Sequence, residues 1–128
     1  MGLTRQPLIV KPSHDSRRKA VVSFLIDSGA VYSVVPARTL ARLGIRPHRT
    51  VEFTLADGTP ISRKVGDAYF ERRGEGGAAP VIFGEDGDEP LLGATTLESL
   101  GLILDPFQRR LLPMRMLLAR SSAGRGED

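Results

Sequence analysis

Cysteine and tryptophan are absent from this chain of 128 residues, and histidine occurs only twice. Without cysteine the chain can form no disulfide and no thiolate metal site, which is compatible with a reducing, cytoplasmic location. His14 and His48 lie in no spacing typical of metal ligands, so we expect no metal and no cofactor. Aromatic residues are also scarce, and the core must therefore be built mainly from Val, Leu, Ile and Ala.

A long apolar run is missing as well. The nearest candidate, residues 111–119, is interrupted by Pro113 and Arg115, whereas a membrane-spanning helix needs about 20 apolar residues. The first residues resemble no secretory signal, and we expect no membrane partner. The length fits one domain over residues 1–118, followed by a polar tail, residues 119–128, that we expect to be disordered.

Basic residues outnumber acidic ones slightly, and the formal net charge is +3. We interpret residues 17–19 as a basic turn, and the spaced Arg38, Arg42, Arg46 and Arg49 as a solvated helix face. The alternative is a nucleic-acid-binding patch, which salt-dependent retention on nucleic acid would favour. We do not expect nucleic acid as a partner.

Strand patterns dominate the chain. The nearly continuous apolar run at residues 19–27 predicts a strand that is buried on both faces. Residues 51–55 alternate in polarity, Asp57-Gly58 predicts a tight turn, and residues 61–70 resume the strand pattern, so we expect a β-hairpin. Shorter strands are expected at residues 7–11, 32–35, 80–83, 102–104 and 109–112.

Two short helices are predicted by their end signals. Pro36 suits a first helical turn, and Gly44 suits the residue that follows the last turn. In the second helix, Thr95 and Glu98 match a capping box and Gly101 is placed to end it.

Two further segments are predicted to be loops, and two others resemble each other. The glycine-rich residues 72–79 are expected to be mobile, and residues 84–90 form an acidic loop. Residues 24–45 and residues 90–104 both follow the order strand, glycine turn, short helix, glycine and apolar residue. This similarity indicates a degenerate internal duplication, with an acid in the turn of the first copy only.

The sharpest chemical feature is the segment Phe-Leu-Ile-Asp-Ser-Gly-Ala at residues 24–30. A carboxylate directly after a buried strand is unfavourable unless partners satisfy it. Gly29 can take a backbone conformation denied to other residues and lets backbone N–H groups approach the Asp27 carboxylate, while Ser28 offers a hydroxyl. Such surroundings hold an acid rigidly at the end of a strand. The alternative is a strand that ends in an ordinary Asp-Ser-Gly turn.

Two motifs together resemble the retropepsins, and most closely the small prokaryotic retropepsin-like proteins. Residues 25–30, Leu-Ile-Asp-Ser-Gly-Ala, followed by apolar Val34-Val35, are similar to the active-site strand and loop of that family. Residues 91–93, Leu-Leu-Gly, a short helix at residues 96–100 and the apolar residues 101–104 resemble its second hallmark, in which Leu92 and Gly93 form the turn.

The resemblance extends over residues 19–113 and implies an all-β fold. That fold is a closed retropepsin-like barrel, one lobe of the acid protease fold, with one or two short helices. It also implies that Asp27 is catalytic and that Ser28, Gly29 and Ala30 support the active-site loop.

Counting the acids then predicts a homodimer. Aspartic peptidases need two adjacent carboxylates that share one proton. This chain has one Asp-Ser-Gly motif, so the second carboxylate must be Asp27 of a second copy, across a two-fold axis. The predicted function is an aspartic endopeptidase that hydrolyses a peptide or protein substrate with water activated between the two carboxylates.

The hairpin at residues 51–64 stands where the family has its flap. Its tip, Ala56, Asp57, Gly58 and Thr59, would then close over substrate and bind its backbone. The alternative is an ordinary surface hairpin.

Two positions depart from the retroviral pattern. Retroviral members carry an acid after the alanine of the motif and an arginine after the hallmark glycine, and these form an ion pair near the dimer interface. Here the positions hold Val31 and Ala94. Because both partners are replaced together, no buried charge is left unpaired, and the dimer must be held differently.

The alternative function is a catalytically silent dimer that binds peptides or serves assembly. The intact motif favours the enzyme, because a binding module has no need of the acid.

Overall fold

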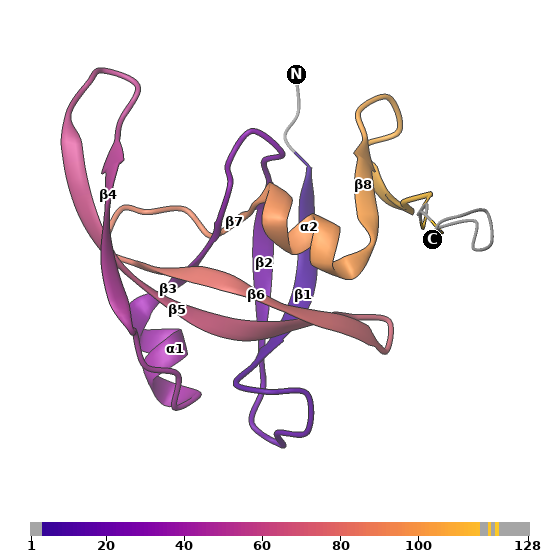
Figure 1. The fold of residues 1–128 in the computed structure, drawn as a ribbon, viewed down its shortest axis with the longest axis horizontal. Coiled ribbons are helices and arrows are strands. Elements are labelled where there is room, and N and C mark those ends of the chain that lie inside the picture. Colours follow the sequence, from indigo (N-terminus) through magenta and orange to yellow (C-terminus); the bar gives the residue numbers. More distant parts are fainter. Residues whose placement is uncertain (1–3, 116–117, 119, 121–128) are drawn as a thin grey trace.

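The computed structural model describes residues 4–115, 118 and 120, and it consists mainly of strands with two short helices (Figure 1). The predicted tail at residues 119–128 lies outside the described residues, apart from Arg120. Neither helix in the described part is long and apolar enough to cross a membrane. The elements are, in chain order, β1 (Arg5–Lys11), β2 (Ala20–Ile26), β3 (Ser33–Pro36), α1 (Ala37–Arg42), β4 (Arg49–Thr54), β5 (Pro60–Arg72), β6 (Glu75–Gly84), β7 (Leu91–Leu92), α2 (Ala94–Leu100), β8 (Leu102–Asp105) and β9 (Arg110–Pro113).

The strand pairings of the large sheet form a circuit that begins and ends at β1. The order is β1-β2-β7-β3-β6-β5-β4, and β1 pairs in addition with β5 through Ile9 opposite Glu71. Two of the pairings, β2 with β7 and β3 with β6, are parallel. The β4–β5 hairpin rises from this circuit, on the left in Figure 1, and β8 pairs with β9 in a separate two-stranded sheet. The prediction that strands dominate the fold is confirmed.

The core lies on one face of the strands, as β2 illustrates. Val22, Phe24 and Ile26 are buried and belong to one apolar cluster, whereas Val21 is 69% exposed. The alternation follows from the two-residue period of a strand. The prediction that this strand is buried on both faces is wrong, because in the single chain only one of its faces packs against the core.

The segment at residues 72–79 is a strand hairpin and not the expected mobile loop. Strands β5 and β6 pair up to a two-residue turn in which Arg73 and Gly74 have φ of 55° and 82°, the left-handed pair that suits such hairpins. The glycines of β6 serve close packing. A Cβ on Gly77 would lie 2.7 Å from the Ser99 carbonyl oxygen of α2, so glycine lets helix and strand approach.

The two predicted helices are present, but the second begins differently from the prediction. Helix α1 follows Pro36, and Gly44 after it has φ of 82°. Helix α2 ends at Gly101 with φ of 68°, as predicted. Its first residue is Ala94, and no side chain caps it, so the predicted capping box of Thr95 is wrong. Backbone carbonyls from elsewhere in the chain take the place of a cap.

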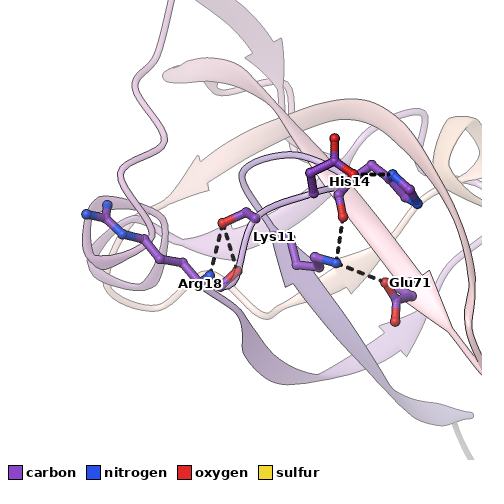
Figure 2. Close-up of polar contacts among 6 residues, drawn as sticks. Lys11, His14, Arg18 and Glu71 are labelled. Atoms are coloured by element: carbon purple, nitrogen blue, oxygen red, sulfur yellow. Dashed lines mark hydrogen bonds and ion pairs between the residues drawn. The ribbon is translucent and has the colours of Figure 1, made fainter.

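The connection between β1 and β2 is fastened to β5 by one lysine. Lys11 Nζ donates to the His14 carbonyl oxygen at 2.8 Å and to Glu71 Oε1 at 3.3 Å (Figure 2). Arg18 N–H donates to Ser16 Oγ at 3.0 Å within the same connection. The basic residues 17–19 therefore lie in a turn region, as predicted.

The packing of β6 against α2 predicts a stability effect at Gly77. We expect Gly77→Ala to lower the free energy of unfolding by about 2 kcal/mol, because the added methyl must displace helix backbone. Urea denaturation followed by circular dichroism measures this. The matched control is Glu75→Ala in the exposed start of the same strand, expected to change stability by no more than about 0.5 kcal/mol. Equal effects of the two substitutions would contradict the packing argument.

Candidate active site

Asp27 lies directly after β2, where two parallel strands end side by side. Ile26 is paired with Leu92 of β7, and Asp27 N–H donates to the Leu92 carbonyl oxygen at 3.0 Å. The residue is exposed in the single chain. The backbone of the acid is thus fixed by a strand that lies far away in the sequence, while its side chain is open to solvent.

The residues after Asp27 form a tight turn, which we call the Asp27 turn (residues 27–31). Gly29 N–H donates to Asp27 Oδ1 at 3.0 Å, and Ala30 N–H donates to the Asp27 carbonyl oxygen at 3.1 Å. Gly29 is not among the glycines with positive φ. A Cβ there would lie 3.3 Å from Asp27 Oδ1. The reason for glycine is therefore close approach to the carboxylate and not the unusual backbone conformation that we expected.

A second turn, the Gly93 turn (residues 92–95), interlocks with the first. Ala94 N–H donates to the Ala30 carbonyl oxygen at 2.7 Å, and Thr95 N–H donates to the Val31 carbonyl oxygen at 3.0 Å. A Cβ on Gly93 would lie 2.7 Å from the Tyr32 carbonyl oxygen, so only glycine fits. The two apolar positions, Val31 and Ala94, thus lie on neighbouring segments. Val31 is 63% exposed.

Two buried hydroxyl groups connect the segments that follow the two turns, and neither was predicted from the sequence. Ser33 Oγ accepts the Gly93 N–H at 2.9 Å and lies 2.5 Å from Thr96 Oγ1. Ser33 and Thr96 are both completely buried. The available signal was a serine within the apolar run of β3, at an inward position of the strand. A buried polar side chain needs a partner, and this one fastens the Gly93 turn.

The predicted internal duplication has a structural counterpart. Strands β2 and β7 run parallel, each ends at one of the two interlocked turns, and a helix follows each turn. Each helix ends at a glycine with positive φ, Gly44 or Gly101, before a buried apolar residue. The acid is present in the first turn only.

The predicted tight turn between β4 and β5 is confirmed. Gly58 N–H donates to the Leu55 carbonyl oxygen at 2.8 Å, and Gly58 has φ of 89°. Asp57 Oδ1 accepts the Thr59 N–H at 2.9 Å, and hydrogen bonds from Thr59 lower the pKa of Asp57. The tip, from Ala56 to Thr59, is exposed. It lies at the same end of the molecule as the connection between β2 and β3, at the top of Figure 1.

The base of this hairpin is fastened to the acidic loop by an arginine. Arg63 Nε donates to Asp88 Oδ2 at 2.7 Å, Nη2 donates to Oδ1 at 3.1 Å, and Glu85 lies 3.5 Å from Nη1. The hydrogen bond from Arg63 lowers the pKa of Asp88, and the same bond raises the pKa of Arg63. Two parallel bonds between a guanidinium and a carboxylate are a strong, oriented contact. The hairpin is therefore held at its base while its tip is exposed.

Two hollows differ in their relation to Asp27. A groove of about 310 Å³ begins at Ser28 and is lined mainly by apolar side chains of α2 and the β8–β9 region, including Leu97, Ile103 and Met114. A larger cavity of about 600 Å³ lies at α1, between Ala37 and Phe83, and none of the Asp27 turn lines it. In the described residues, no group of three or more His, Asp or Glu side chains comes together as a metal site.

Comparison with known proteins finds solved structures that resemble the chain. No protein-family model matches, and no curated protein matches. The solution structure of the protease of simian foamy virus (mac) is similar to this chain with a TM-score of 0.49 and 24% sequence identity. The match covers 73% of this chain and 92% of that chain.

The buried hydroxyl pair predicts that Ser33→Ala destabilises the protein by about 2 kcal/mol. The substitution leaves the buried Gly93 N–H without its acceptor, and a buried unsatisfied donor carries its full desolvation penalty. Urea denaturation measures the effect. Ser23→Ala, at an exposed position of β2, is the control and should change stability by no more than about 0.5 kcal/mol. A Ser33→Ala protein as stable as the control would show that the pair does not hold the turns together.

The contact between Arg63 and Asp88 predicts a dependence of stability on pH. The pKa of Asp88 is lower in the folded protein than its ordinary value of 3.8. The ionised form therefore stabilises the fold. This contribution is fully present above pH 3.8 and is lost as the pH falls through the lowered pKa.

The measurement is the free energy of unfolding of wild-type and Asp88→Asn protein across this range. At neutral pH the variant should be less stable by about 1 kcal/mol, and the difference should shrink below pH 3.8. Asp86→Asn in the same exposed loop is the control and should show no such trend. A constant difference between wild type and Asp88→Asn at every pH would assign the effect to something other than ionisation.

Proposed function

We propose that this chain is one half of a homodimeric aspartic endopeptidase, with a retropepsin-like closed barrel and with Asp27 of each copy in the catalytic pair. The observation that carries the proposal is the Asp27 turn. This turn presents the exposed carboxylate of Asp27, and its Oδ1 accepts a hydrogen bond from Gly29 N–H. The backbone N–H of Asp27 donates to the Leu92 carbonyl oxygen, which fixes the residue at the end of the strand. A fixed, solvent-accessible acid is what general acid–base chemistry on a peptide bond requires.

The second copy supplies what one chain lacks. A lone carboxylate cannot share a proton with a like partner, whereas two carboxylates in contact ionise in separate steps. The surface around Asp27 favours such a partner. Val31 is 63% exposed and Ile103 is 45% exposed, and the apolar groove of about 310 Å³ starts at Ser28. A two-fold axis at the Asp27 turn would cover these apolar groups and bring the two acids together.

The chemistry of the pair follows from one shared proton. The protonated carboxyl donates a hydrogen bond to the oxygen of the scissile carbonyl, and the ionised carboxylate takes a proton from the attacking water. The proton then passes to the leaving nitrogen as the carbon–nitrogen bond breaks. The flap, Ala56 to Thr59, closes over the substrate and excludes bulk water during these steps. A cytoplasmic location remains a prediction from the absence of cysteine.

Mixing subunits tests the proposal directly. Asp27→Asn should abolish hydrolysis of a peptide library while the fold is retained, because asparagine is close in shape but cannot take up a proton. When wild-type chains are refolded with an excess of Asp27→Asn chains, each mixed dimer holds only one carboxylate. Activity should then follow the square of the wild-type fraction, which is the probability that both copies are intact.

Two controls make the result decisive. Mixing wild-type chains with Asp86→Asn chains, which are altered in an exposed loop, should cause no loss of activity, because every mixed dimer keeps both Asp27 carboxylates. Subunit exchange is checked independently with differently labelled chains. A linear decline with confirmed exchange would mean that Asp27 finds its partner within its own chain. Hydrolysis by pure Asp27→Asn protein at the wild-type rate would place the chemistry elsewhere.

A further inference from the structure

An arginine of the hairpin contacts the segment that leads out of the Asp27 turn. Arg49, the first residue of β4, donates from Nη2 to Tyr32 Oη at 3.2 Å. Its guanidinium carbon also lies 5.8 Å from the centre of the Tyr32 ring, a distance at which the ring attracts a cation. Tyr32 directly precedes β3 and follows the exposed Val31. Arg49 thus lies where the base of the hairpin meets the Asp27 turn.

The register of β4 shows which face of the hairpin carries this arginine. Side chains in a strand alternate between its two faces. Val51 and Phe53 are half-buried, whereas the residues between and beside them are exposed. Arg49 shares the face of Val51 and Phe53, and its contact with Tyr32 shows that this face is turned toward the segment that follows the Asp27 turn. A peptide held between the hairpin and the two acids would lie against it.

The charge of Arg49 is not compensated as that of Arg63 is. Arg63 stands opposite Val51 in the hairpin, and its guanidinium is paired with Asp88 and Glu85. Arg49 has no carboxylate within 4.0 Å in the part of the chain that the structure describes. A guanidinium has five N–H donors in a fixed fork, and its contact with Tyr32 uses one of them. The others are available to a carboxylate, which a guanidinium can bind through two parallel hydrogen bonds.

We propose that Arg49, oriented by Tyr32, is a specificity-determining residue that binds an acidic side chain of the peptide substrate. The inference rests on the proposed function, since it places substrate between the hairpin and the Asp27 pair. An extended peptide presents its side chains at regular intervals to fixed pockets. The acidic residue should therefore occupy one constant position relative to the bond that is cleaved.

Cleavage of matched peptides tests the preference. Peptides taken from the products of a library digest are synthesised in pairs that differ only in Glu or Gln at one position. Wild-type protein should show kcat/KM about tenfold higher for Glu at a single position, as expected for one charge-assisted contact. Arg49→Gln should bring this ratio close to one, and Arg49→Glu should shift the preference to Lys. Tyr32→Phe, which keeps the ring and removes the hydroxyl, should reduce the ratio.

The control is Arg38→Gln, which removes a positive charge from exposed α1 and should retain the wild-type ratio. An acidic preference that survives in Arg49→Gln, or cleavage by wild type without any acidic preference, would overturn the inference.

A binding measurement separates this inference from the proposed activity. Asp27→Asn protein is titrated with fluorescent Glu and Gln peptide mixtures of otherwise equal composition, and anisotropy reports the affinity. Tighter binding of the Glu mixture that disappears in Asp27→Asn/Arg49→Gln protein supports the role of Arg49. If this binding result is obtained while wild-type protein cleaves no peptide, the peptidase proposal fails and the role of Arg49 stands. Equal binding of both mixtures would overturn the role of Arg49.

Discussion

The parallel pairing of β2 with β7 is the constraint on which the rest of the site depends. Strand β7 has only two residues, and its place is set by the pairs Leu25–Leu91 and Ile26–Leu92. This pairing brings the ends of two strands together, so that the turns after them exchange backbone hydrogen bonds. Helix α2 in turn receives its first acceptors from the Asp27 turn. One short contact between distant segments therefore fixes the positions of the acid, of the second turn and of the start of helix α2.

Local features of this structure could be predicted from sequence because their causes are local. The tight turn at Asp57-Gly58, the end of α1 at Gly44 and the end of α2 at Gly101 each depend on a glycine with positive φ. The position of Asp27 after an apolar strand was predictable for the same reason, since hydrophobic patterning and a turn signal meet there.

The features that sequence reasoning missed depend on contacts between distant residues. The glycines at residues 76 and 77 resembled a flexible segment, yet they make room for Phe70 and Ser99 of other elements. Thr95 matched a capping pattern, but its N–H is satisfied by Val31 across the turns. No local pattern predicts that Ser33 contacts Thr96 in the core. Packing partners decide such positions, and a single sequence does not show them.

The order of the strands also has a consequence for the time course of folding. β1 must find β5, β2 must find β7, and β3 must find β6 before the circuit of pairings is complete. Each of these encounters closes a loop of many residues, so its entropic cost comes before any stabilising contact. Topologies of this kind fold slowly compared with helical bundles of similar size. Because the backbone of Asp27 is held by Leu92, the geometry around the acid forms only once β2 and β7 have paired, which is late in the chain's synthesis and in its folding.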